Sequence, residues 1–282
     1  MIEPQDYLEP PCPLDSAACS CGGAHRHAPR RRDAAQRRIP LAKVIAECDA
    51  LFNAEKIEEL GSHLRRWLAE ARAIEDRQSE LSLLSELMGH YRMTGDKERG
   101  LQAVRDGFRL LAELGIGGSV SAGTILINGA TALKEFGETE EALARYADAF
   151  RCYDNHLDPN DWRFASLLNN MAAAYAEAGD VERAEAHYGK ALDVLAACGN
   201  RVDAAVTHVN LAQLRHQIDP EDERIAEDLE RALECLNDPE VKRDGYYAHT
   251  CRKCASAFGF FGWFRDEADL NKRAGAIYHA RA

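Results

Sequence analysis

The chain has 282 residues, of which 46% are hydrophobic, and its formal net charge is −12. The apolar share suffices for a continuous buried core, and the negative charge argues against nucleic acid or anionic membranes as partners of the main body. No run of about eighteen apolar residues is present, so we expect no transmembrane helix. The first thirty residues lack an apolar signal core, and the nine cysteines are scattered, so we expect a cytoplasmic protein with free thiols.

Residues 1–38 differ in composition from the rest of the chain. They are rich in proline, glycine, cysteine and arginine and show no apolar period, which predicts a disordered N-terminal arm. The arm holds five candidate metal ligands, namely Cys12, Cys19, Cys21, His25 and His27. Residues 19–23 resemble the opening of small zinc-binding tail motifs, but the closing ligands depart from that pattern. A metal-free segment is therefore the favoured interpretation.

The arm also carries a basic patch. Its arginines are Arg26, Arg30, Arg31, Arg32, Arg37 and Arg38. Between residues 21 and 38 only Asp33 opposes these six, which leaves a net charge of +5 (6 − 1). Such a patch could contact nucleic acid or an acidic partner, or fold back on the acidic remainder of the chain. Because no aromatic residues are interleaved, we do not expect sequence-specific recognition of nucleic acid, and a solvated tail is the simplest interpretation.

From Ile39 onward, apolar residues recur at three- and four-residue steps, which predicts one all-helical domain over residues 39–282. A glycine followed by an acidic residue interrupts this pattern at 95–96, 137–138 and 179–180, as helix caps and helix dipoles favour. Longer interruptions fall near residues 115–118, 156–161, 199–200 and 237–239. The pattern predicts about a dozen helices in antiparallel pairs and no strand.

One cassette of residues recurs at an interval of 42. Its clearest copy is Tyr175, Gly179, Ala184, Tyr188 and Ala191. The places 42 residues earlier hold Leu133, Gly137, Ala142, Tyr146 and Ala149, and those before them hold Tyr91, Gly95, Gly100, Val104 and Gly107. The small residues let two helices approach closely, the large ones fill the gap between neighbouring pairs, and the first glycine permits a left-handed turn. A fixed period of this size predicts an array of stacked units.

This cassette resembles the tetratricopeptide repeat, most clearly over residues 77–236. The period exceeds the usual value of about 34 and is similar to that of kinesin light chains. The resemblance implies an all-α fold, a right-handed superhelix (α-solenoid) of about five to six antiparallel helix pairs. Degenerate units are expected at residues 39–76 and 240–282, because end units present a polar outer face. Other helical repeats, with periods of about 40–47, are the alternative.

A fourth unit keeps Ala212, Leu229 and Ala232 but departs from the cassette elsewhere. Arg215 replaces the tyrosine, Asp219 replaces the glycine, and the unit carries one extra residue.

In this architecture the first helix of each pair lines the concave groove, and an amide recurs there in register. Asn128, Asn170 and Asn210 each lie two residues before an alanine that repeats with the cassette, namely Ala130, Ala172 and Ala212. A side-chain amide can pair with both polar groups of a peptide bond, and the resemblance implies that these asparagines hold a peptide backbone. Bridging between adjacent helices is the alternative. The neighbouring groove positions are Thr131, Lys134, Asn169, Gln213 and His216.

The last unit places His249, Arg252 and Lys253 at positions expected to face the groove, with Lys253 where the earlier units have asparagine. A basic end to the groove favours an acidic or carboxyl-terminal ligand segment. A solvated basic face on a capping unit is the alternative.

Two further features of the last unit are open to more than one interpretation. Residues 258–264 are strongly aromatic and could close the core or form an exposed patch for a partner. Cys251 and Cys254 have the spacing of a zinc knuckle, but they lie in a predicted helix without a second pair, which favours buried thiols.

The chain shows no nucleophile motif, phosphate-binding loop or paired-carboxylate arrangement. We therefore predict a protein- or peptide-binding scaffold or adaptor that is not an enzyme and needs no cofactor. One alternative is a peptide-responsive regulator of a second protein, and another is a metal- or nucleic-acid-binding role through the arm. Oligomeric state and partner identity are not indicated by the sequence.

Overall fold

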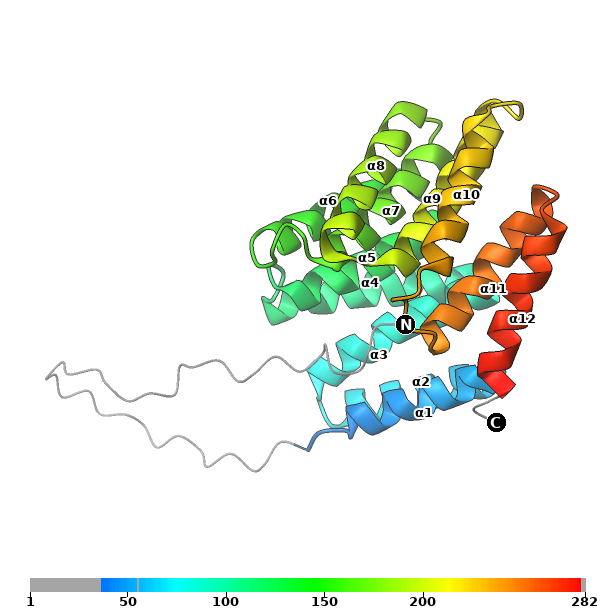
Figure 1. The fold of residues 1–282 in the computed structure, drawn as a ribbon. Helices are drawn as coiled ribbons and strands as arrows, with labels where there is room; N and C mark the ends of the chain where they lie inside the picture. Colours follow the sequence, from blue (N-terminus) through cyan, green and yellow to red (C-terminus); the bar gives the residue numbers. More distant parts are fainter. Residues whose placement is uncertain (1–36, 55, 280–282) are drawn as a thin grey trace, which may run out of the picture. The chain divides into compact units, whose positions relative to one another are not determined.

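The computed structural model describes residues 37–279 except residue 55, and over these residues the chain forms twelve α-helices and no strand (Figure 1). The arm predicted at 1–38, with its candidate metal ligands Cys12, Cys19, Cys21, His25 and His27, lies outside the described residues except for its last two. No helix among the described residues is long and apolar enough to cross a membrane.

The chain divides into two compact units, one up to Gly115 and one from Ile116 onward. The first contains α1 (Leu41–Asn53), α2 (Ile57–Ala73), α3 (Arg77–Thr94) and α4 (Lys97–Leu114). The second contains α5 (Val120–Glu135), α6 (Thr139–Asp154), α7 (Trp162–Glu177), α8 (Val181–Cys198), α9 (Arg201–Ile218), α10 (Arg224–Asn237), α11 (Gly245–Phe260) and α12 (Phe264–His279).

Within each unit, helices adjacent in sequence pack as pairs. The pairs of the first unit are α1 with α2 and α3 with α4, and α2 also packs on α3. The pairs of the second unit are α5–α6, α7–α8, α9–α10 and α11–α12, and successive pairs meet through α6–α7, α8–α9 and α9–α11. The predicted fold class, an all-α array of antiparallel helix pairs, is confirmed.

The turns between α3 and α4 and between α7 and α8 follow the predicted glycine–acid pattern, whereas at 137–138 Gly137 has φ +84° but the Glu138 side chain does not cap α6. Gly95 ends α3 with φ +69°, and the Asp96 side chain accepts the Arg99 N–H at 3.1 Å at the start of α4. Gly179 has φ +79°, and Asp180 caps α8 in the same way. Glycine reaches this left-handed region without the Cβ clash that other residues meet, so each turn reverses the chain within two or three residues.

The cassette residues form the core between pairs. Ala172 and Ala184 are fully buried where α7 meets α8, and they belong to one cluster with Tyr188, Leu211 and Leu214. The absence of a larger side chain at the two alanines lets the helices approach, and Tyr188 then fills the space toward α9. Burying each large apolar side chain contributes about 1.5–3 kcal/mol.

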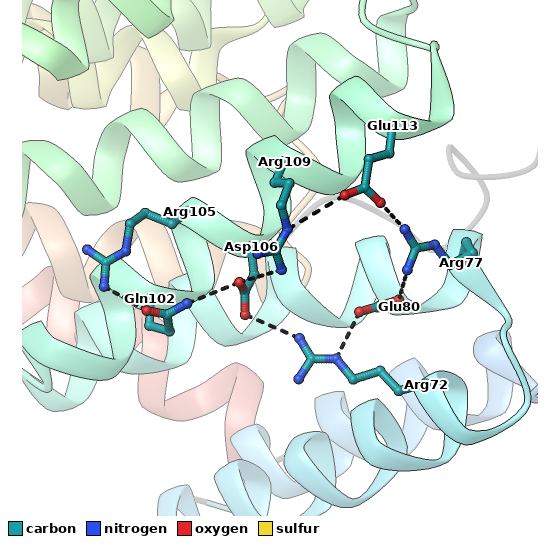
Figure 2. Close-up of polar contacts among 8 residues, drawn as sticks. All are labelled: Arg72, Arg77, Glu80, Gln102, Arg105, Asp106, Arg109 and Glu113. Carbon is teal, nitrogen blue, oxygen red and sulfur yellow. Dashed lines mark hydrogen bonds and ion pairs between the residues drawn. The ribbon is translucent and has the colours of Figure 1, made fainter.

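The first unit carries a closed ring of three arginines and three carboxylates that joins α2, α3 and α4 (Figure 2). In order around the ring these are Arg72, Glu80, Arg77, Glu113, Arg109 and Asp106. Gln102 and Arg105 extend the network along α4. Exposed ion pairs contribute about 0.2–1 kcal/mol each, so the ring fastens the ends of three helices without dominating their stability.

The aromatic segment at the end of α11 divides between core and surface. Phe258 is fully buried and meets the Trp263 ring edge-on at 5.8 Å. Phe260 and Phe264 remain 67% and 68% exposed. Phe258 therefore belongs to the core, whereas Phe260 and Phe264 lie at the surface.

Candidate peptide-binding face

The first helices of the pairs in the second unit are α5, α7, α9 and α11, and the three recurring asparagines lie on the first three of them. Asn128, Asn170 and Asn210 are all half-buried. Asn128 already interacts with another group of the protein. The side-chain amides of Asn170 and Asn210 form no hydrogen bond with any residue that the structure describes.

Asn169, the neighbour of Asn170, is instead a bridge between helices. Its Nδ2 donates to the Thr207 hydroxyl on α9 at 2.9 Å, and that hydroxyl donates to the Asp203 carbonyl at 3.0 Å. Asn169 Oδ1 is buried and has no hydrogen-bond partner among the described residues. Internal bridging, the alternative for the recurring asparagines, thus occurs one position away from them.

Thr131 and Lys134, on α5, are also engaged within the fold. The Thr131 hydroxyl lies 2.8 Å from the Ile127 carbonyl and 3.0 Å from the Tyr146 hydroxyl on α6. The Lys134 ammonium is 3.5 Å from Glu177 on α7, and its side chain is only 13% exposed. These two residues stabilise the pairing of helices and offer little to a ligand.

The remaining predicted positions on α9 differ from each other. Gln213 is exposed, whereas His216 packs edge-on against Phe260 and Phe261 with ring centroids 5.2 and 5.5 Å apart. His216 therefore connects the ends of α9 and α11.

The start of α11 is tied to α9, because the Tyr246 hydroxyl donates to the Asp203 carboxylate. Beyond it, His249, Arg252 and Lys253 are exposed on α11. Desolvation by neighbouring atoms lowers the pKa of His249 although the residue is exposed at the surface, and the charges of Lys253 and Arg252 lower it further. Arg252 stands 5.8 Å above the Tyr278 ring, and Lys253 has no ion-pair partner in the described part of the chain.

The two cysteines of α11 are buried free thiols. Burial raises the pKa of Cys254 to about 12 and also raises the pKa of Cys251, so neither is a thiolate at neutral pH. Across residues 37–279, apart from residue 55, no group of three or more His, Cys, Asp or Glu side chains is placed to hold a metal ion.

Comparison with known proteins agrees with the helix pairing. Residues 163–238, which span α7 to α10, match the family model of the tetratricopeptide repeat (TPR). The chain has a tetratricopeptide-repeat fold. None of the curated proteins matches this chain in sequence.

Several solved structures resemble the chain over most of its length. A Podosopora anserina protein with "kinesin light chain nearly identical TPR-like repeats" has a TM-score of 0.50 and 16% identity, covering 70% of this chain and 94% of that one. A substituted form of that protein has a TM-score of 0.51 and 15% identity, with coverages of 72% and 97%. BtubC (BKLC) from P. vanneervenii has a TM-score of 0.48 and 18% identity, with coverages of 86% and 93%. At these identities the likeness is one of fold.

Proposed function

We propose that the face formed by α7, α9 and α11 binds an extended peptide segment of a partner protein. The observation that carries this proposal is the state of Asn170 and Asn210. Both amides are half-buried on successive first helices, and neither has a hydrogen-bond partner among the described residues. An amide left unpaired at a helix surface keeps its donors and its acceptor for a peptide bond.

The dimensions of the repeat support an extended ligand. Packed helices stand about 8–10 Å apart, and an extended chain advances about 3.3 Å per residue. One amide per unit therefore meets a bound strand at about every third residue. Asn170 and Asn210 would then hold the ligand backbone, while Gln213 and the residues of α11 contact its side chains.

The basic residues of α11 favour an acidic or carboxyl-terminal end for this segment. Lys253 occupies the repeat position that Asn170 and Asn210 occupy in earlier units, and it has no acidic partner among the described residues. A carboxylate on the ligand would form a charge-assisted hydrogen bond with it, which is about twice as strong as a neutral one.

The role of the protein would then be that of a scaffold or adaptor in the cytoplasm. TPR folds generally mediate contacts between proteins and typically carry no catalytic activity, which supports a binding role over an enzymatic one.

Selection from a displayed library of random peptides tests the proposal. The full chain serves as bait beside the double variant Asn170→Ala/Asn210→Ala and the control Asn155→Ala. Asn155 follows the last residue of α6, a second helix of its pair, and its side chain donates to the Arg151 carbonyl. We expect the wild type and the control to enrich the same peptides, rich in Asp and Glu, and the double variant to lose them. Equal enrichment by all three proteins would contradict the proposal.

A further inference from the structure

A pocket of about 420 Å³ lies between α8, α9 and α10, where the fourth unit departs from the cassette. In the third unit, Tyr175 on α7 packs against His187 on α8 with ring centroids 4.9 Å apart. The corresponding positions of the fourth unit hold Arg215 and Asp228, which form an ion pair. A pair of rings is thus replaced by a pair of charges, and the pocket opens beside them.

Two charged side chains at this pocket are largely buried. The side chains of Arg215 and Asp228 are 16% and 4% exposed, and His208 Nδ1 lies 3.1 Å from Asp228. Withdrawing charged groups from water costs several kcal/mol each, and pairing them seldom does more than offset this cost. Stability alone therefore does not explain the cluster, and charged groups gathered in a pocket mark a candidate ligand site.

Two guanidinium groups converge here on one carboxylate. Arg215 Nε and Arg224 Nη1 each lie 3.7 Å from Glu185 Oε1, which is too far for a hydrogen bond. Arg215 Nε is out of contact with solvent and has no hydrogen-bond partner among the described residues. Arg224 is otherwise held by Asp222, and Arg215 by Asp228. The Glu185 carboxylate thus lies between two donors and satisfies neither.

We propose that this pocket binds a small organic acid whose carboxylate takes the place of the Glu185 carboxylate. The oxygens of that carboxylate would accept from Arg215 Nε and from Arg224 Nη1, one nitrogen of each guanidinium group. The apolar body of the acid would lie against Leu192 and Leu211, which also line the pocket. Pockets for small ligands usually measure about 300–1,000 Å³, so the space is adequate.

An anion that displaces the Glu185 carboxylate leaves the net charge of the pocket unchanged. The pocket lining contains three arginines, the third being Arg231, and three carboxylates, the third being Glu227. With Glu185 turned outward, these three arginines face Glu227, Asp228 and the Asp222 carboxylate that pairs with Arg224, and the bound acid restores the charge that Glu185 had supplied. The site is separate from the proposed peptide face, because neither Asn170 nor Asn210 lines it.

Calorimetric titration of the full chain with hexanoate, benzoate, 4-phenylbutyrate and indole-3-acetate, each beside its primary amide, tests this site. We expect at least one acid to bind and its amide not to bind. Arg224→Gln should weaken that acid about tenfold, because a charge-assisted hydrogen bond is lost. Glu185→Gln should tighten it about threefold or more, because a competing carboxylate is removed.

The matched control is Arg183→Gln, which alters an exposed arginine of α8 that pairs with Asp180 outside the pocket. It should leave the affinity unchanged, and thermal melting should show all three variants folded. The proposal is overturned if no acid binds to the wild type or to Glu185→Gln, if the amide binds equally well, or if Glu185→Gln weakens the acid.

Discussion

At the scale of single residues, Glu75 holds the backbone conformation that glycine holds elsewhere. Its φ is +58°, and it is the one non-glycine residue with positive φ among the described residues. It lies between α2 and α3, whereas the turns that follow α3 and α8 use Gly95 and Gly199, with φ of +69° and +70°. A non-glycine residue in this region is strained by about 1–2 kcal/mol.

Glu75→Gly should therefore raise the free energy of unfolding by about 0.5–1 kcal/mol, since relief of strain exceeds the added entropy of the unfolded chain. Urea denaturation followed by circular dichroism measures the change. The control Glu70→Gly, inside α2, should lower stability by about 1 kcal/mol. A loss of stability in Glu75→Gly would show that the turn is not strained.

A second prediction at the scale of single residues concerns Asp161, the N-cap residue of α7. The hydrogen bond from the Arg163 side chain holds the pKa of Asp161 below its usual value, and the Arg163 backbone N–H adds to the effect. A carboxyl whose pKa falls on folding stabilises the fold above its unfolded pKa of about 3.9, and this stabilisation is lost as pH falls through the folded pKa.

Asp161→Asn should consequently be less stable than the wild type at pH 6, and the difference should shrink as the pH falls toward about 2.5. Asparagine is chosen because it caps a helix about as well as aspartate, so the difference isolates the charge. Urea denaturation across this pH range measures it. A difference that is constant with pH would mean that the pKa of Asp161 is not lowered.

At the scale of helices, the packing of paired helices depends on small residues that let their backbones approach closely. A Cβ added to Gly123 on α5 would lie 2.6 Å from the ring of Tyr153 on α6. That ring is 2% exposed, and its hydroxyl lies 3.1 Å from the Thr124 hydroxyl, so it has little freedom to move.

Gly123→Ala should accordingly lower the free energy of unfolding by about 1–3 kcal/mol, the usual cost of overpacking. Gly275→Ala, in α12, is the matched control, because a Cβ there meets nothing within 4 Å. It should raise stability by up to about 1 kcal/mol through helix propensity. Thermal or urea denaturation compares the two, and equal effects would mean that the α5–α6 spacing tolerates a side chain.

The helix pairs and their turns could be predicted from the sequence, but the partners of individual polar side chains could not. The glycine–acid steps at Gly95 and Gly179 predicted where helices end, because a left-handed turn needs glycine. By contrast, Asn169 and Asn170 are identical in type and adjacent. Which of them bridges to α9 depends on Thr207, 38 residues away. The repeat position of Asn170 predicted its availability to a ligand, which remains a prediction.

The pocket between α8, α9 and α10 could not be predicted from the sequence either, because it too depends on contacts between side chains far apart in the chain. The sequence showed that Arg215 breaks the cassette, and this was the available signal. Its pairing with Asp228 and its approach to Glu185 depend on side-chain positions on α10 and α8, which a repeat period does not report.

At the scale of the whole molecule, the proposed peptide face belongs to the second compact unit, which begins at Ile116. The period of 42 predicted one continuous array over residues 39–282, and it carries no signal for the division after Gly115. If the amides of Asn170 and Asn210 hold a ligand, their replacement should lower affinity and leave the stability of the fold nearly unchanged.

The most direct measurement is calorimetric titration of a library-selected peptide into the wild type and into Asn170→Ala/Asn210→Ala, with the melting temperature of each protein. Each lost hydrogen bond is worth about 0.5–1.5 kcal/mol, so we expect affinity to fall by about 1–3 kcal/mol, or about 5- to 150-fold. The melting temperature should change by less than about 3 °C. Unchanged affinity together with a large fall in melting temperature would contradict the proposed role, because the two asparagines would then stabilise the array and not hold a peptide.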